Sequence, residues 1–363
     1  AGLDVKSLLI ISALALVVAA APTPGAAATP HPGRVVYDEH CAVCHDNSEQ
    51  SKARTFETLT RMIPGPIEYA LTNGRMKAQG AALSSTELED LMNFFRGQTR
   101  SDNDWEAGAM CADRSVDTKP AATVSTFGFG PKNHRYLSEA QAGLTRADFE
   151  NLELAWALAF PNITMMRSQP VVVGDTLFLT PVDSERLYAF DISGTPCLRW
   201  VYHAEGPLRS SLTYGRLPES GRQVLVFGGM DGRLHMVDAA NGERIWVRSM
   251  KLFPETIITG APQLHEGVVY ASISQFEIMV GANPEHECCK SHGAVAAVAG
   301  ESGEVIWISH TMPDAEPVRD RGDGRMIWGP SGAPVWTSPA IDAKRGVLYV
   351  GTGEATSEPA HPH

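Results

Sequence analysis

Apolar residues between positions 31 and 98 recur at the spacing of an α-helix. The last segment of this region, "LSSTELEDLMNFFRG", has a capping pattern at Ser85 and a glycine, Gly97, where the pattern stops. Its apolar positions share one helical face: Leu88, Leu91, Met92 and Phe95. We therefore predict a small all-α domain over residues 31–98.

Beyond residue 128 the pattern changes to short apolar strands separated by glycine-containing turns. Three segments resemble one another: "RLYAFDISGTPCLRW", "RLHMVDAANGERIW" and "AVAAVAGESGEVIW". Each places an apolar strand before a turn and a tryptophan in the strand that follows, and "NLELAW" supplies a further such tryptophan. A period of about 45 residues is typical of the blades of an all-β propeller. The tryptophans that mark it are Trp156, Trp200, Trp246 and Trp307.

Residues 129–363 leave room for about four blades of this length. A propeller protects the edges of its sheets by closing into a ring, so we expect this propeller to be C-terminally incomplete and the sequence to be part of a longer protein. A complete small propeller is the alternative. The polar stretch over residues 99–128 is predicted to be a linker.

The first 28 residues have the layout of a signal peptide. Lys6 precedes an apolar run from Leu8 to Ala20, and small residues follow as far as Ala28. The run is short for a membrane span, although an uncleaved anchor is an alternative interpretation. We expect export to a periplasm without stable membrane insertion, in a compartment where disulfides can form.

The charge of the chain narrows the range of partners. The formal net charge is -12 at pH 7, and the isoelectric point is near 5.5. Nucleic acid and anionic lipid are bound through clustered Lys and Arg, so we expect neither as the main partner. A basic protein partner suits this charge better.

Candidate chemistry begins at "CAVCH". Cys41 and Cys44 lie three positions apart on one helical turn, so each thiol can add to a vinyl group of haem, and His45 then faces the iron. A thioredoxin-like redox pair would need a βαβ context, and a zinc site would need a second pair of ligands. We therefore predict a haem c site.

The second axial ligand of this haem is expected in a loop before the last helix. "LTNGRMKAQGAALSSTELEDL" resembles the loop of class I cytochromes c that delivers a methionine, and this resemblance makes Met76 the predicted iron ligand. Met62, in "RMIPGP", is the alternative. A thioether ligand raises the haem potential relative to a second imidazole, so we expect this haem to accept electrons.

Other stretches resemble a known family. "NLELAWALAFP", "MRSQPVVVGDTLFL", "WGPSGAPVWTSPAIDAKRGVLYVGTGE" and the tryptophan-bearing repeats are similar to the pyrroloquinoline quinone (PQQ) alcohol dehydrogenases, whose fold is an eight-bladed propeller. Within that family the sequence is most similar to the polyvinyl alcohol dehydrogenases, which carry a cytochrome c domain like the one predicted here over residues 31–98. The resemblance covers nearly all of residues 31–363, of which the propeller part corresponds to about the first half of the family's fold.

The resemblance implies a cofactor site. Arg209 matches an arginine beside the quinone, and Thr259 matches a threonine that bonds a PQQ carboxylate. Glu277 matches a calcium-binding glutamate that adjoins PQQ, and Trp336 matches the tryptophan under the flat quinone. Glu354 falls where many relatives have a calcium-binding Asn, so its carboxylate keeps an oxygen donor for calcium. Packing between blades for the tryptophan and an ion pair for the strand glutamate are the alternative interpretations.

The activity that the resemblance implies is oxidation of an alcohol by PQQ, with electrons passing through the haem to an external cytochrome c. The family's catalytic base is an aspartate at a position beyond His363, so no catalytic residue is assigned here. A quinohaemoprotein dehydrogenase for small alcohols is one alternative. A propeller scaffold without PQQ is another, although a scaffold has no use for the electron relay that the haem motif indicates.

An insertion in the last tryptophan interval holds two adjacent cysteines, Cys288 and Cys289, in "PEHECCKSHGAV". They can form a metal site with His286 and His292, although neighbouring side chains diverge. They can also form separate bridges to Cys111 and Cys197.

The resemblance suggests a third interpretation of this pair. Relatives place a vicinal disulfide against PQQ, opposite the tryptophan. In those relatives the pair precedes the arginine that Arg209 matches, whereas Cys288 and Cys289 follow Glu277. We predict a vicinal disulfide that caps PQQ, on a different blade.

Overall fold

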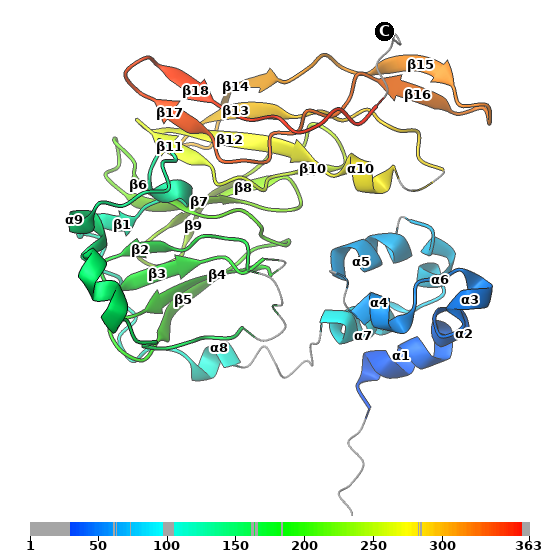
Figure 1. Ribbon diagram of the computed structural model, residues 1–363, viewed down its shortest axis with the longest axis horizontal. Coiled ribbons are helices and arrows are strands. Elements are labelled where there is room, and N and C mark those ends of the chain that lie inside the picture. Colours follow the sequence, from blue (N-terminus) through cyan, green and yellow to red (C-terminus); the bar gives the residue numbers. More distant parts are fainter. Residues whose placement is uncertain are drawn as a thin grey trace, which may run out of the picture.

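The computed structural model describes residues 30–60, 62, 64–72, 74–96, 105–160, 163, 166–182, 184–281, 283 and 285–357. The predicted signal peptide, residues 1–28, lies outside the described residues. Figure 1 shows a helical domain beside a stack of β-sheets. Within the described ranges, no helix has the length and apolarity that crossing a membrane requires.

The helical domain packs around one apolar core. Tyr37, Leu91 and Phe95 are buried at its centre. Gly33 allows α1 and α7 to approach closely, because a Cβ at this position would lie 1.9 Å from the carbonyl oxygen of Asp90. The prediction of a small helical domain is confirmed. Its helices are α1 (Pro32–His40), α2 (Ala42–His45), α3 (Ser48–Ser51), α4 (Phe56–Thr60), α5 (Pro64–Thr72), α6 (Lys77–Ala81) and α7 (Ser85–Arg96).

The start of α7 corrects the predicted cap by one residue. The backbone N–H of Glu87 donates to Ser84 Oγ at 3.2 Å, and the backbone N–H of Ser84 donates to the Glu87 carboxylate at 2.7 Å. A capping box needs its Ser three positions before the Glu, which selects Ser84 in "SSTE". Ser85 is instead the first residue of the helix.

The first sheet includes part of the predicted linker. Helix α8 (Trp105–Gly108) is followed by Cys111, which forms a disulfide with Cys197. The strand at 122–124 then pairs with the next strand of the sheet. Much of 105–128 is therefore packed onto the first sheet. Its strands, in spatial order, are β1 (Ala122–Val124), β2 (Val171–Val173), β3 (Thr176–Leu179), β4 (Arg186–Asp191) and β5 (Cys197–His203), and the short helices η2 (Phe127–Phe129), α9 (Glu139–Ala142) and η3 (Arg146–Asn151) lie between β1 and β2 in the sequence.

Two further sheets stack on the first, and two hairpins follow (Figure 1). The second sheet contains β6 (Thr213–Arg216), β7 (Gln223–Gly228), β8 (Arg233–Asp238) and β9 (Arg244–Ser249). The third contains β10 (Thr256–Ile257), β11 (Gln263–His265), β12 (Val268–Gln275), β13 (Ala294–Ala299) and β14 (Val305–His310), with α10 (Glu277–Val280) after β12. The hairpins pair β15 (Glu316–Asp320) with β16 (Met326–Gly329) and β17 (Ala340–Asp342) with β18 (Val347–Tyr349).

The three sequence repeats form equivalent hairpins. Trp200, Trp246 and Trp307 pair with Ala189, Met236 and Ala297, and in each hairpin the register shifts directly after that pair. A bulge at the same place in each sheet increases its twist in the same way. The repeat prediction is thus confirmed for these three segments, which form blade-like sheets.

Contact between neighbouring repeats explains why each needs a tryptophan and a glycine. Gly242, in the turn of the second repeat, has φ 73° and faces Trp200 so closely that a Cβ would lie 2.6 Å from the indole ring. Gly303, in the third repeat, has φ 70° and lies against Trp246 in the same way. Only glycine combines a left-handed backbone with this close approach. The tryptophan of one repeat therefore packs under the turn of the next.

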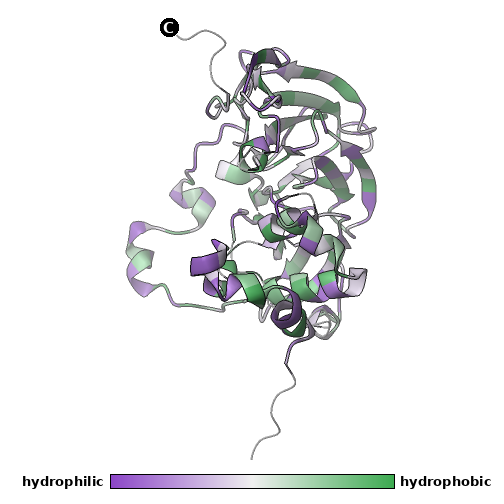
Figure 2. Ribbon diagram, turned by 90° about the vertical axis from the view of Figure 1, so that its right-hand side faces the viewer, coloured by the Kyte–Doolittle hydropathy of each residue, from purple (hydrophilic) through white to green (hydrophobic). Residues whose placement is uncertain are grey.

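Apolar residues fill the space between the sheets. One buried cluster joins the first sheet to the second, and another joins the second to the third. Figure 2 shows apolar residues, in green, along the strands of the stacked sheets, interspersed with hydrophilic positions. This stacking of sheets on their apolar faces is the arrangement that a propeller requires.

The first of the four predicted tryptophans is an exception. Trp156 lies within residues 152–160, which contain no strand, and its side chain is exposed. The expectation that "NLELAW" contributes a blade strand is therefore wrong for the described residues. Alternating apolar residues form a strand only when another strand takes up their backbone hydrogen bonds, and none pairs with this segment in the described part of the chain.

Candidate functional site

Residues of the helical domain form most of the wall of a cavity of about 670 Å³. The single helical turn of α2 brings Cys41, Cys44 and His45 to its wall, because the backbone N–H groups of Cys44 and His45 both donate to the carbonyl of Cys41. Leu59, Ile67, Leu71, Leu83, Leu91 and Phe95 supply apolar parts of the same wall. The cavity is therefore a mostly apolar space with two thiols and an imidazole at one side.

The imidazole of His45 is held in one orientation. Its Nδ1 lies 2.6 Å from the carbonyl oxygen of Arg54. A carbonyl only accepts hydrogen bonds, so Nδ1 carries the proton and Nε2 keeps its lone pair. This arrangement is the one that metal-binding histidines adopt, and it leaves Nε2 as the ligand atom.

The two thiols of this turn are unbonded in the structure. Burial, and then the proximity of Cys44, raise the pKa of Cys41 to about 11. The two thiols, the imidazole and the apolar wall together fit a haem.

Both candidate methionines line this cavity. Met76 precedes α6, and its backbone N–H donates to the carbonyl of Ala70, which fixes the loop between α5 and α6. Met62 lies between α4 and α5 and packs on the same core. The assignment of Met76 as the second ligand therefore stays a prediction.

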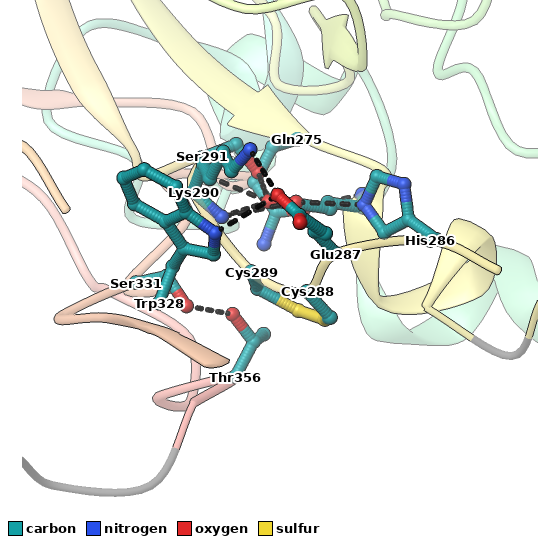
Figure 3. Close-up of polar contacts among 11 residues, drawn as sticks. Gln275, His286, Glu287, Cys288, Cys289, Lys290, Ser291, Trp328, Ser331 and Thr356 are labelled. Atoms are coloured by element: carbon teal, nitrogen blue, oxygen red, sulfur yellow. Dashed lines mark hydrogen bonds and ion pairs between the residues drawn. A yellow bond between two sulfur atoms is a disulfide. The ribbon is translucent and has the colours of Figure 1, made fainter. Parts of the chain in front are cut away.

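In the β region, Glu277 organises the loop that carries the adjacent cysteines. The residue is 1% exposed, and its carboxylate accepts hydrogen bonds from the backbone N–H groups of Lys290 and Ser291, at 2.8 and 2.6 Å, and from the Ser291 hydroxyl. His286 Nε2 lies 2.9 Å from the other carboxylate oxygen. Figure 3 shows these partners converging from the loop after α10.

These hydrogen bonds set the ionisation of Glu277. Burial pushes its pKa up, but the hydrogen bonds from Ser291, His286 and Lys290 outweigh burial, and the pKa lies below the usual 4.5. The carboxylate of Glu277 is therefore an anion that accepts several hydrogen bonds from the loop around it.

The same donors bear on the predicted calcium site. Calcium binds six to eight oxygen atoms, whereas both carboxylate oxygens of Glu277 face N–H and O–H donors. The side chain of Glu354, the other predicted ligand, is exposed, and its backbone carbonyl accepts a hydrogen bond from Ala333. The arrangement around Glu277 does not fit calcium, and we derive no step from that ion.

The structure joins Cys288 to Cys289 in a disulfide (Figure 3). Cys111 and Cys197 bond to each other, which excludes separate bridges from the adjacent pair. The histidines of the metal hypothesis have other partners: His286 binds Glu277, as described, and His292 Nε2 lies 2.8 Å from His310 Nδ1.

Trp328, on β16, binds this loop, a role that was not predicted from the sequence. Its Nε1 donates to the Glu287 carboxylate at 3.2 Å, and its backbone N–H donates to the Cys288 carbonyl. The ammonium of Lys290 lies 4.2 Å from the centre of its ring. The sequence shows this tryptophan just before the "GPSG" turn. Its partners lie about forty residues earlier in the chain, so its role could not be predicted from its neighbours.

The structure brings Thr259 and Trp336 together. The Thr259 hydroxyl donates to the backbone carbonyl of Trp336 at 3.1 Å. Gly260 follows, so close to the carbonyl of Thr337 that a Cβ would lie 2.5 Å from its oxygen. The indole of Trp336 is nevertheless 58% exposed, so it is a flat ring available for stacking, beside a hydroxyl group.

Arg209 lies on the adjacent segment. Its backbone N–H donates to the carbonyl of Gly228, and the carbonyl of Gly229 accepts from Ile258, the residue before Thr259. The segments of Arg209 and Thr259 therefore flank the end of the same strand, β7. Arg209, Thr259 and Trp336 thus lie on three backbone segments that are neighbours in space.

The chain is similar to several known proteins. Residues 125–360 match the family described as "PQQ: Glucose/ethanol/alcohol dehydrogenase, beta-propeller domain". The chain is 29% identical to a polyvinylalcohol dehydrogenase of Pseudomonas sp, over 91% of this chain and 53% of that protein. It is 27% identical to a polyvinylalcohol dehydrogenase of Sphingopyxis sp., over 90% of this chain and 52% of that protein. The chain therefore spans about half the length of these relatives.

Solved structures agree on the fold. A quinohaemoprotein alcohol dehydrogenase of Pseudomonas putida superimposes with a TM-score of 0.50 over 68% of this chain and 37% of that protein. The sequence identity is 21%, so the similarity concerns the fold alone. The family match, over residues 125–360, involves the stacked sheets.

Proposed function

This chain belongs to the glucose, ethanol and alcohol dehydrogenase family of PQQ β-propellers, and on that premise we propose that the whole protein oxidises alcohols with PQQ as its cofactor. PQQ supplies a two-electron acceptor for the alcohol. The chain's own contribution is a site in which the exposed Trp336 ring stacks on the flat cofactor. Arg209 would offer a guanidinium to its carboxylates, and Thr259 would offer its hydroxyl once that hydroxyl turns from the Trp336 carbonyl, to which it donates in the structure.

We propose secondary alcohol groups of polyvinyl alcohol as the substrate. The observation in favour is the extent of the similarity: the polyvinylalcohol dehydrogenases match 90% or more of this chain, so the match extends into its helical region. A quinohaemoprotein alcohol dehydrogenase of Comamonas testosteroni matches only 64% of this chain. A small alcohol is the second candidate, since that protein shares the family of the propeller.

We propose further that the helical domain carries haem c. Cys41 and Cys44 would hold the haem covalently, and His45 and Met76 would bind its iron. Electrons from the substrate would leave through this haem to an external cytochrome c. The signal-like residues 1–28 support export to a periplasm, where such an acceptor is accessible.

One observation supports this combined function most directly. A propeller of the PQQ family is joined to a cavity whose wall holds Cys41, Cys44 and an oriented His45. A propeller scaffold without redox chemistry would have no use for the second feature. The alternative of a PQQ-less scaffold is therefore disfavoured.

The deciding experiment uses the full-length protein, purified with haem and incubated with PQQ. Reduction of ferricytochrome c is followed with polyvinyl alcohol and with 2-propanol, with and without PQQ. PQQ-dependent turnover of the polymer at a higher kcat/KM per hydroxyl group supports the proposal. Turnover of 2-propanol alone moves the substrate to small alcohols, and haem-loaded protein that neither retains nor responds to PQQ refutes the dehydrogenase.

A further inference from the structure

The wall of the cavity in the helical domain is completed by residues of the propeller. Phe276, Met279, Val280 and Asn283 line the same space as Cys41 and its neighbours. All four belong to α10 or to the residues beside it. The cavity is therefore shared between two domains that the sequence separates by about two hundred residues.

The side chains of α10 divide between two environments. Glu277 is buried and holds the disulfide loop, whereas Met279 lines the cavity of the helical domain and is 55% exposed. Its neighbour Ile278 is exposed to a similar extent, 49%, but does not line the cavity. Adjacent positions on one helix point about 100° apart, which explains why only one of the two reaches the cavity.

Two further residues of the cavity wall, Tyr69 and Phe276, come from the two different domains. Tyr69, on α5, lines the cavity, and its pKa is raised first by burial and then by the charge of Glu255. The carbonyl of Glu255 accepts a hydrogen bond from the backbone N–H of Phe276, another cavity residue. Tyr69 thus lies near the propeller segment that packs against the start of α10.

The far end of α10 lies against the disulfide. Gly281 follows the helix, and a Cβ at that position would lie 2.8 Å from Cys288 Sγ. One short helix therefore has the cavity on one side and the Cys288–Cys289 loop on the other. Any larger residue at Gly281 would push the loop and the helix apart.

We propose that α10 is the propeller's wall of the haem cavity and that Met279 shields the haem from water, which raises its reduction potential. The inference rests on the haem site of the proposed function. Ferric haem carries one more positive charge than ferrous haem, so an apolar wall disfavours the ferric form, and a polar group or water in its place favours it. Met279 is in this role a positioning and shielding residue, and Met76 remains the proposed ligand.

The test compares three variants of the full-length, haem-loaded protein with the unaltered protein by spectroelectrochemical titration. Met279→Gln keeps the side-chain length and adds a polar amide, Met279→Leu keeps the apolar wall, and Ile278→Gln adds the same amide one position away. We expect Met279→Gln to shift the haem potential to lower values, while the other two variants keep the potential of the unaltered protein.

Each result has a definite meaning. Equal potentials in all four proteins overturn the role of Met279 while leaving the haem proposal intact. A potential that falls equally in Met279→Leu and Met279→Gln would make Met279 an iron ligand and also overturn its role as a wall. Absence of covalent haem from the unaltered protein refutes the haem proposal itself, and this inference with it.

Discussion

The chain holds two pairs of neighbouring cysteines, and the structure treats them differently. Cys41 and Cys44 remain thiols on the helical turn of α2, at the wall of a cavity. Cys288 and Cys289 are bonded to each other in a loop that Glu277 holds from below by hydrogen bonds to its backbone. A helical turn directs the two thiols of Cys41 and Cys44 toward a bound group. Two adjacent cysteines in an anchored loop, such as Cys288 and Cys289, instead have each other as the nearest partner. Spacing and backbone together decide which chemistry a cysteine pair can perform.

The largest expected effect is on covalent haem. The double substitution Cys41→Ser and Cys44→Ser removes both thiols that can add to the vinyl groups, so covalent haem should be lost completely. Denaturing gel electrophoresis with haem staining measures it. The control is the double substitution Cys288→Ser and Cys289→Ser, which should keep the stain. Loss of stain in the control alone would reverse the roles of the two pairs.

Thiol labelling sharpens the same contrast in haem-free protein. The pKa of Cys41, raised from 9.0 to about 11, gives at pH 8 about 100-fold less thiolate than an ordinary thiol. Iodoacetamide should therefore alkylate Cys41 slowly, and faster as the pH approaches 11. Cys288 and Cys289 should take up no label until a reductant is added. Mass spectrometry of the peptides measures both, and unreduced labelling of Cys288 would contradict the disulfide.

The anchor of the loop is tested by Glu277→Gln. The amide places N–H groups against the backbone donors of Lys290 and Ser291, so we expect a loss of about 3 kcal/mol in the free energy of unfolding. Chemical denaturation followed by tryptophan fluorescence measures it. Glu287→Gln is the matched control in the same loop, because Glu287 is partly exposed and its loss should cost much less than the loss of Glu277. Equal effects would remove Glu277 as the anchor.

A smaller effect should appear in the dependence of stability on pH. Because the folded-state pKa of Glu277 lies below the usual 4.5, the unfolded chain binds this proton first as the pH falls. The stabilisation from the carboxylate is thus complete above about pH 4.5 and is lost as the pH falls through the lower folded value. The stability of Glu277→Gln should fall less steeply over that acid range than that of the unaltered protein. Parallel pH profiles from thermal melts would contradict the hydrogen-bonded anion.

Much of the fold could be predicted because its signals are local. The repeats are set by contacts between a tryptophan and a glycine turn, such as Trp200 with Gly242, and both residue types are visible in the sequence. The helical turn of "CAVCH" likewise follows from spacing alone. The strand predicted around Trp156 was wrong because a strand depends on a partner elsewhere in the chain, and the cap at Ser84 was missed by one position because "SS" offers two hydroxyls.

The sequence alone determined the residue types and spacings: the helical domain, the three blade repeats, the thiols of Cys41 and Cys44, and the adjacent cysteines. Tertiary structure decided which distant groups meet. It placed Glu277 under the loop of Cys288, paired Thr259 with Trp336, and brought Met279 to the cavity of the helical domain. The physical reason is that periodicity records what each segment buries, whereas contacts between segments depend on how the sheets and helices stack.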